Sequence, residues 1–349
     1  MNIVIGIYTC LLLTFTFLPL IRNDYWVFRV FDYPRLQKLF LNISAVVLLL
    51  TCYSGPAIYK QLQLLVLCIN IIYLLWLIIP FTPFGKKQVL RAGPVNQHKS
   101  LSIMIANVLQ TNHNTKGCLN EVAKSDPDVV ILLEANKRWD TETRSLKEKY
   151  PYAERVPLEN MYGLLLYSKL EMIETSTQYL VEKDIPSIHT KIKLRNGQLV
   201  QFYAVHPTPP VPGENVRATE RDKELLLVAD LAKQSRLPVI VAGDLNDVAW
   251  SHTTDLFLKM SGLLDPRRGR GFFNSFNAHH FFLRFPLDHA FISRHFKVIT
   301  LKRLNNYDSD HFPIFLHVQL DDDAYLEQQP LQADQEDIEE AVEKKKKTT

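Results

Sequence analysis

The chain has 349 residues, a formal net charge of +3 at neutral pH and a hydrophobic content of 47%. This length allows more than one structural unit. The small net charge excludes a strongly basic or acidic protein whose partner could be inferred from charge alone. Of the four cysteines only Cys118 lies beyond the first 84 residues, which excludes an intradomain disulfide or a thiolate metal site there.

The first 84 residues are mostly apolar and predict a membrane region. Three stretches, at about 1–21, 40–59 and 62–81, are each close to the roughly 20 residues that cross a bilayer core. We expect a tight hairpin between the second and third spans, at Lys60 and Gln61. A cleaved signal peptide is the alternative for the first stretch, but that stretch has no basic N-terminal region.

Basic residues predict the orientation of these spans. The loop after the first span carries four of them and the stretch after the third span carries three, whereas the hairpin carries only Lys60. The positive-inside rule therefore places the C-terminal part on the cytoplasmic side. The sequence predicts a multi-pass protein of the cell membrane, with the lipid bilayer as a partner.

Residues 85–99 are predicted to be a linker, and 100–320 to be an α/β domain. Short apolar runs bounded by Pro, Gly or Asn predict strands; they lie at 101–108, 128–135, 162–169, 187–194, 199–206, 238–245, 287–293 and 313–320. Helical spacing is found at 118–125 and 216–235. Many strands with few helices between them indicate two packed sheets flanked by helices.

The last segment, 321–349, is highly charged and has little apolar content. Such a composition is typical of a disordered tail. The alternative is a short helix from Gln335 to Lys346.

Polar side chains stand at the ends of the predicted strands. A single Asn or Asp at such a place is more often a turn former than a ligand. Loops at strand ends are nevertheless where a scaffold displays chemistry, and here the whole set is coherent. Its members are Asn107, Glu134, His206, Asp244, Asn246, Asp288, Asp310 and His311.

This set combines hard oxygen ligands with two histidines. Carboxylate and carboxamide oxygens suit Mg²⁺, or Mn²⁺. A His beside a carboxylate can act as a general base, and a second His can donate to a phosphoryl oxygen. Metal, base and donor together predict the hydrolysis of a phosphate ester.

Six motifs carry these residues in the order found in a known superfamily. They are "IAN" (105–107), "ILLEA" (131–135), "HPTPP" (206–210), "GDLND" (243–247), "PLDHAFIS" (286–293) and "SDHFPI" (309–314). Over about residues 100–320 the chain resembles the endonuclease/exonuclease/phosphatase superfamily, whose fold is that of deoxyribonuclease I. The three apolar stretches before this domain make it similar to membrane-anchored bacterial members. The resemblance implies a four-layer α/β/β/α sandwich preceded by about three transmembrane helices.

The resemblance also implies roles. Glu134 would bind the metal, with Asn107 and Asp310 near it. Asp244 and Asn246 would position the attacking water and the phosphate. The base would be His311, oriented by Asp288, and His206 would contact the scissile phosphate. Leu133 and Leu245 depart from the family pattern. Both lie at apolar positions, so we expect them to tune the reaction rather than abolish it.

The segment 265–286 interleaves arginines with phenylalanines and is a candidate substrate wall, with Arg268, Arg270 and Asn274 as substrate-binding residues. Such residues hold phosphates and stack bases, or lie against anionic headgroups. The alternative is a solvated loop with a few core aromatics.

We expect a metal-dependent phosphoesterase, foremost a phosphodiesterase or nuclease. A membrane-anchored lipid or small-molecule phosphatase or phospholipase, or a catalytically silent binding domain, are the alternatives.

We make predictions for two further residues, one in the "GDLND" motif and one shortly after it. Gly243 is expected to let the backbone turn where a phosphate comes close. Trp250 is expected to be a packing aromatic.

Overall fold

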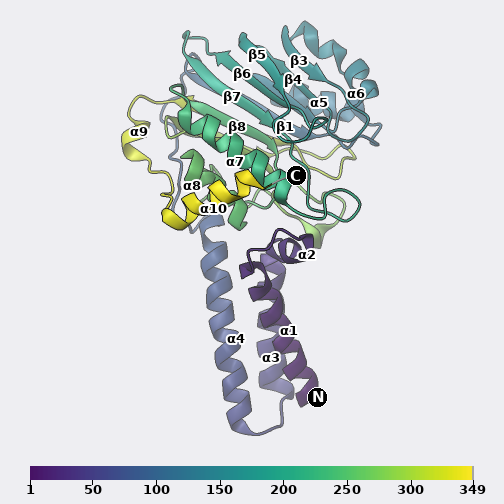
Figure 1. Cartoon of the computed structure of the whole chain (residues 1–349), viewed down its shortest axis with the longest axis vertical. Helices are drawn as coiled ribbons and strands as arrows, with labels where there is room; N and C mark the ends of the chain where they lie inside the picture. Colours follow the sequence, from purple (N-terminus) through teal and green to yellow (C-terminus); the bar gives the residue numbers. More distant parts are fainter. Residues whose placement is uncertain (348–349) are drawn as a thin grey trace.

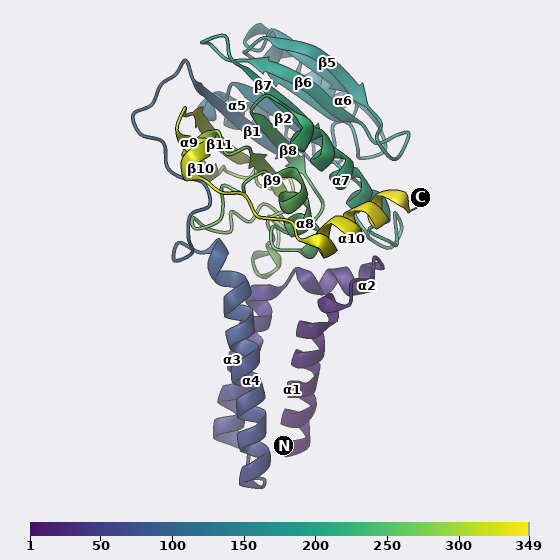
Figure 2. The ribbon, with the colours of Figure 1, turned by 60° about the vertical axis from the view of Figure 1, so that its left-hand side comes forward.

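Three long helices form a bundle that projects from the rest of the molecule in the computed structural model, which describes residues 1–347 (Figures 1 and 2). They are α1 (Asn2–Phe17), α3 (Arg35–Cys52) and α4 (Ala57–Ile78), and each is long and apolar enough to cross a membrane. Only 22%, 22% and 28% of the residues in an apolar 18-residue stretch of each span are buried. Helices that stay apolar on their outer faces are suited to lipid rather than to water.

The turn between α3 and α4 corrects the predicted hairpin. It lies at 53–56, and Lys60 and Gln61 are already part of α4. Pro56 directly precedes the first residue of α4, where its missing N–H donor costs nothing. The second span is therefore displaced by several residues toward the N-terminus relative to the predicted 40–59.

Residues 21–38, which we call the connecting segment, join α1 to the first turn of α3 and contain α2 (Trp26–Arg29). This segment lies between the helix bundle and the α/β unit (Figure 2). It makes hydrogen bonds to the α/β unit, such as the one from the Trp26 N–H to the Val216 carbonyl (3.0 Å). The two parts of the molecule are therefore joined by direct contacts as well as by the chain.

Two sheets form the α/β unit. The first has the order β10-β11-β1-β2-β4-β3 and the second the order β5-β6-β7-β8-β9. The first sheet contains β1 (Ser100–Asn107), β2 (Val129–Leu133), β3 (Tyr152–Val156), β4 (Leu164–Ser168), β10 (Phe296–Arg303) and β11 (Ile314–Leu320). The second contains β5 (Met172–Gln178), β6 (Ser187–Lys193), β7 (Leu199–Val205), β8 (Val239–Asp244) and β9 (Asp288–Ile292).

All eight predicted strands are present, and the three that the sequence did not predict, β3, β5 and β10, are edge strands. Edge strands are covered less than central ones, so their sequences carry more polar residues and no continuous apolar run. β5 reads MIETSTQ, for example, and none of its residues is fully buried. Apolar runs therefore reveal the centre of each sheet, and at the margins they revealed only β9, which is buried throughout.

Helices cover both outer faces, and the main core lies between the sheets. That core contains side chains from both, such as Ile105, Ile131, Phe202 and Ile240. The first sheet is covered by α5 (Thr115–Ser125) and α6 (Lys137–Glu142). The second is covered by α7 (Thr219–Gln234) and α8 (His252–Ser261). The predicted four-layer α/β/β/α sandwich is confirmed.

The prediction of a disordered tail is wrong for most of 321–347. The tail forms α9 (Ala324–Glu327) and α10 (Gln335–Lys346), and α10 packs against α7 and α8 (Figure 1). Asp334 and Asp337 form a capping box at the start of α10. The alternative, a short helix from Gln335 to Lys346, is confirmed. Composition favoured disorder because the stability of this helix comes from packing and ion pairs with the domain. Thr348 and Thr349 lie outside the described residues.

Four buried charges, which we call the junction cluster, tie the connecting segment to α7 and α10. They are Asp24, Arg29, Asp222 and Lys344. The Lys344 Nζ lies 2.7 Å from Asp222 Oδ2 and 3.3 Å from Asp24 Oδ1, and Arg29 also pairs with both carboxylates. Burial alone would raise the pKa of Asp24 and of Asp222, but Lys344 and the other cations outweigh it and lower both. The tail helix therefore has a structural role at this junction.

Candidate active site

The two sheets bring their polar strand ends to one place. β1 is parallel to β2, and β7 is parallel to β8, so the ends of each pair lie side by side. β9 is antiparallel to β8, and its first residue, Asp288, is paired with the last residue of β8, Asp244. The structure therefore assembles residues that are up to about 200 positions apart, as the parallel and antiparallel pairings require.

Asn107 links the two sheets at this point. Its Nδ2 donates to Glu134 Oε1 (2.7 Å) and to Asp244 Oδ2 (3.1 Å). The Ser309 hydroxyl donates to the Asn107 carbonyl (2.8 Å) and fixes the start of the "SDHFPI" motif to β1. The amide thus holds one carboxylate from each sheet at a defined separation.

His311 lies between two carboxylates. Its Nδ1 is 2.7 Å from Asp288 Oδ2, and its Nε2 is 3.6 Å from Asp244 Oδ2. Burial alone would lower the pKa of His311, but Asp288 and Asp244 outweigh it and raise this pKa to about 10. The ring is therefore oriented by Asp288 and presents Nε2 to the centre of the site.

His206 has a different environment, although it is equally buried. Its Nε2 lies 4.0 Å from Asp244 Oδ2, and its ring packs against Tyr162 with the ring centroids 5.2 Å apart. Burial lowers the pKa of His206 to about 4, so the ring is neutral at neutral pH. Its Nδ1 has no hydrogen-bond partner within residues 1–347. The site therefore contains one cationic and one neutral imidazole.

Glu134 and Asn246 both adopt the left-handed backbone region, with φ of 58° and 51°. Non-glycine residues seldom adopt it, and such strain is concentrated at functional sites. The Asn246 N–H donates to Asp244 Oδ1 (2.9 Å), and its side chain donates to the Pro207 carbonyl (2.9 Å). Asn246 thereby connects the loops that follow β7 and β8.

The carboxylates fit a divalent cation. Asp288 Oδ1 and Asp310 Oδ1 are buried without a hydrogen-bond partner in the described chain, and burial raises the pKa of Glu134 to about 7. Among the described residues, Asp244, Asp288 and His311 have potential ligand atoms within 4.8 Å of one another. Because Asp288 already holds the His311 ring, the oxygen-rich side of the site, with Glu134 and Asn107, suits a hard cation better.

The three predicted substrate-binding residues have different outcomes. Arg268 and Arg270 are engaged elsewhere, which corrects their assignment to the substrate wall: Arg268 pairs with Asp255 of α8 (3.1 Å) and Arg270 donates to the Val89 carbonyl of the linker (2.6 Å). Asn274 lies beside Ser275, whose hydroxyl accepts from the Asp288 N–H (3.1 Å). Its role in substrate binding stays a prediction.

Two other arginines stand next to the site. The Arg284 and Arg303 guanidinium groups lie 4.9 Å and 4.1 Å from the centroid of the Phe312 ring, and Phe312 directly follows His311. The Phe276 ring packs on His311 with centroids 5.0 Å apart. Sequence alone did not separate Arg284 and Phe276 from the other arginines and phenylalanines of 265–286, because the folded path of that segment is irregular, and it gave no signal for Arg303 at the end of β10.

Tyr33 and Arg221 also contact the site from outside the motifs. The Tyr33 hydroxyl donates to the Asn246 carbonyl (3.1 Å), and Arg221 Nη1 donates to the same oxygen (2.8 Å). Trp250 packs as predicted in a buried cluster with Phe81, and its Nε1 also donates to the Asp32 carbonyl (2.8 Å). No motif could have revealed Tyr33, because it lies in the connecting segment.

Gly243 is required for a reason other than the predicted one. It has φ of 154° and lies within β8, paired with Val205 of β7. A Cβ atom at this position would lie 1.8 Å from the Val205 carbonyl oxygen. The close approach is therefore to the neighbouring strand, and the glycine holds β7 and β8 at the distance that places His206 beside Asp244.

Comparisons with known proteins agree with this geometry. A model of the Endonuclease/Exonuclease/phosphatase family matches residues 104–311, which is more than half of the chain. The chain belongs to this family. Proteins of the family are generally phosphoester hydrolases. No protein with a curated description matches the chain.

Solved structures show the same fold at low identity. D. rerio TDP2 complexed with single strand DNA product is 16% identical with a TM-score of 0.54, over 63% of this chain and 99% of that one. The human Nocturnin catalytic domain with bound sulfate is 17% identical with a TM-score of 0.52, over 65% and 97%. A family protein from Bacteroides thetaiotaomicron is 19% identical with a TM-score of 0.51, over 64% and 96%.

Proposed function

We propose that this protein is a divalent-metal-dependent hydrolase of phosphate esters, foremost a phosphodiesterase or nuclease. The observation that carries the proposal is the arrangement of His311 between Asp288 and Asp244, with Asn107 joining Asp244 to Glu134. A base, its orienting acid and a group of oxygen ligands that converge on one point are the elements that phosphoester hydrolysis requires.

Glu134 would hold the cation, Mg²⁺ or Mn²⁺, with Asn107 and Asp310 near it. When bound, the cation supplies positive charge that offsets the charge developing on the phosphate oxygens. Asp244 and Asn246 would position the water and the phosphate.

His311 would accept the proton of the attacking water. The surrounding carboxylates raise its pKa to about 10, and neutralising them lowers that pKa toward the range of a general base. Asp288 keeps Nδ1 protonated and leaves Nε2 free to accept. His206, which is neutral because burial lowers its pKa to about 4, would donate a hydrogen bond to a phosphoryl oxygen.

The helices α1, α3 and α4 would anchor the catalytic domain in a membrane. The connecting segment and the catalytic domain stand at the same end of the bundle (Figure 1), and this end carries most of the basic residues that flank the helices. By the positive-inside rule the catalytic domain would be cytoplasmic. A reporter fused to the C-terminus tests this orientation: activity only on the outer face would contradict it.

The function is tested with the full-length protein in detergent, with bis(p-nitrophenyl) phosphate and Mg²⁺ or Mn²⁺. We expect turnover that chelation abolishes, and a loss of about 100-fold or more in His311→Gln. His317→Gln is the matched control, since His317 is a partly buried histidine of β11 outside the site. Equal rates in His311→Gln and the wild type would contradict the proposal, and absence of all turnover would favour a silent binding domain.

A further inference from the structure

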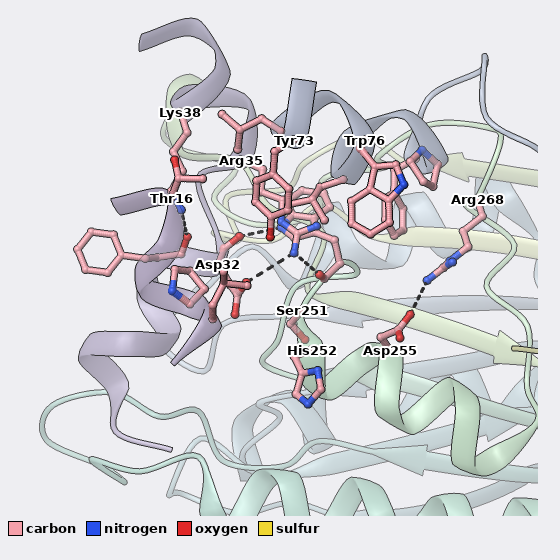
Figure 3. A pocket seen from close by; sticks show the side chains of 18 residues that line it. Thr16, Asp32, Arg35, Lys38, Tyr73, Trp76, Ser251, His252, Asp255 and Arg268 are labelled. Atoms are coloured by element: carbon pink, nitrogen blue, oxygen red, sulfur yellow. Dashed lines mark hydrogen bonds and ion pairs between the residues drawn. The ribbon is translucent and has the colours of Figure 1, made fainter. Parts of the chain in front are cut away.

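The junction between the helix bundle and the α/β unit has the residues of a membrane interface. A cavity of about 490 Å³ opens there (Figure 3). It is lined from α4 by Tyr73 and Trp76 and from α3 by Arg35 and Lys38. Aromatic rings and long cationic side chains at the ends of apolar helices mark the level of the lipid headgroups. The first turn of α3 therefore lies at that level.

Two loops that flank the active site reach this same level. The loop after His206 contacts the connecting segment through the Val216 carbonyl, which accepts from the Trp26 N–H (3.0 Å). The segment before Asp288 contacts it through the Phe282 carbonyl, which accepts from the side chain of Gln37 in the first turn of α3. Segments that follow His206 and precede Asp288 are thus both in contact with residues at the headgroup level.

Three apolar side chains, which we call the apolar wedge, project beside Gln37. They are Phe281, Phe282 and Leu283, and their exposed fractions are 72%, 79% and 53%. Within 100–320 these are the three most exposed large hydrophobic residues. Contiguous exposed apolar residues mark an interaction surface, and aromatic residues at a bilayer boundary suit its interfacial zone. Their place beside α3 identifies the bilayer as the partner.

The apolar wedge is continuous with the wall of the active site. The Arg284 guanidinium lies 5.2 Å from the Phe281 ring centroid and 4.9 Å from the Phe312 ring centroid, and Phe312 is next to His311. Arg284 Nε is buried without a hydrogen-bond partner in the described part of the chain. A cation with unused donor capacity therefore stands between the apolar wedge and the catalytic histidine.

We propose that the active site hydrolyses the phosphoester headgroup of an amphiphile in the bilayer, and that the apolar wedge inserts into that bilayer beside it. This inference rests on the proposed function and names its substrate class. In the reaction the water oxygen bonds to phosphorus, the ester P–O bond breaks, and one water proton ends on the leaving alcohol oxygen. The apolar part of the substrate stays in the lipid while Arg284 faces its anionic headgroup.

Nucleic acid is the competing substrate class. Its binding requires a basic surface that contacts several phosphates. Three arginines of 265–286 are instead bound within the protein: Arg267 pairs with Asp265 (2.9 Å), Arg268 with Asp255 (3.1 Å), and Arg270 donates to main-chain carbonyls. Beside the site, at the membrane level, the chain instead presents the apolar wedge.

The experiment uses the full-length protein in phosphatidylcholine nanodiscs that also contain phosphatidylglycerol, sphingomyelin and a phosphoinositide. Three substrates are compared with Mg²⁺: the bilayer lipids, soluble bis(p-nitrophenyl) phosphate and a single-stranded oligodeoxynucleotide. The test variant combines Phe281→Ser, Phe282→Ser and Leu283→Ser. Leu326→Ser is the matched control, because Leu326 is 63% exposed on α9, away from the apolar wedge.

We expect the wild type to cleave a bilayer lipid, and the triple variant to lose about tenfold or more on that lipid because it buries less apolar surface. Its rate on the soluble diester should be unchanged, and the control should match the wild type on both. An unchanged lipid rate in the triple variant, or cleavage of the oligonucleotide or the soluble diester without cleavage of any lipid, would overturn the inference and leave the proposed function standing. Absence of turnover on all three substrates would refute both.

Discussion

Two clusters of buried charge in this molecule differ in how their carboxylates are paired. In the junction cluster, Asp24 and Asp222 each contact Lys344 and Arg29, and the pKa of both carboxylates is lowered. In the candidate active site no ion pair to Glu134 is found within residues 1–347, and burial outweighs the attraction of His311 and raises the pKa of Glu134 to about 7. The carboxylates of the junction cluster are thus balanced by nearby cations, whereas Glu134 of the candidate active site is not.

The difference separates structural from functional charge. A buried carboxylate with matched cations stabilises the fold, and removing one partner leaves an uncompensated charge. A buried carboxylate without a cation destabilises the fold, and such groups are typical of sites that bind a ligand. Substitutions in the junction cluster should therefore lower mainly the stability, and substitutions in the candidate active site mainly the activity.

The largest effect is expected for Asp244→Asn, which removes a carboxylate contacted by Asn107, Asn246 and His311. We expect phosphodiester hydrolysis to fall by about 100-fold or more. The melting temperature should change little, because the lost attraction to His311 is offset by the lost repulsion of Glu134 and Asp288, and an Asn side-chain oxygen can still accept from Asn107 or Asn246. Steady-state kinetics and thermal denaturation of the same preparation measure both quantities. A lower melting temperature with unchanged activity would show that Asp244 has a structural rather than a functional role.

Asp222→Asn should have the opposite profile. It leaves Lys344 and Arg29 short of a buried partner, and we expect a loss of about 3–5 kcal/mol in the free energy of unfolding. Asp230→Asn is the control, because Asp230 pairs with Lys345 between the same two helices but is 34% exposed, so about 1 kcal/mol or less is expected. Equal losses in the two variants, measured by denaturant unfolding, would refute a special role for the junction cluster.

Glu224 sharpens the comparison, because it lies on the same helix as Asp222 but is paired with no cation within residues 1–347. Burial and Glu182 raise its pKa to about 8. The unfolded chain loses this proton near pH 4.5 and the folded chain near pH 8, so stability is lost as pH rises between these values. Glu224→Gln should reduce this decrease of stability with pH, measured as melting temperature against pH. Glu343→Gln, at an exposed residue, should leave it unchanged.

The smallest effect is expected for Tyr33→Phe. This change removes one of two donors to the Asn246 carbonyl, and Arg221 keeps the other. We expect a loss of about 1 kcal/mol in stability and only a few-fold decrease in the rate. A rate as low as that of Asp244→Asn would show that the connecting segment belongs to the catalytic machinery itself.

Much of the fold could be predicted because burial leaves a clear pattern. The central strands, such as β1 and β8, are buried throughout and mostly apolar, and they were predicted. β5 was not, and α10 entered only as the alternative to a disordered tail, since edge strands and helices held by ion pairs depend on neighbours that are distant in the sequence. The α3–α4 turn was misplaced because Lys60 is polar but helical, whereas the break is set by Pro56.

The strand-end residues of the candidate site could also be listed from the sequence. Their convergence, as in the contact of Asn107 with Glu134 and Asp244, follows from strand pairing that no local pattern contains. Arg268 and Arg284 show the limit most clearly. They lie in one irregular segment with similar neighbours, and only the folded path separates the one that pairs with α8 from the one that stands beside the site.

The central claim, which rests on the proposed function, is that the carboxylates of the candidate active site bind a divalent cation. Mn²⁺ binding to the full-length protein, followed by electron paramagnetic resonance, tests it most directly when Glu134→Gln and Asp222→Asn are compared. We predict that the wild type and Asp222→Asn bind Mn²⁺ and that Glu134→Gln does not. Equal binding by Glu134→Gln and the wild type would contradict the claim.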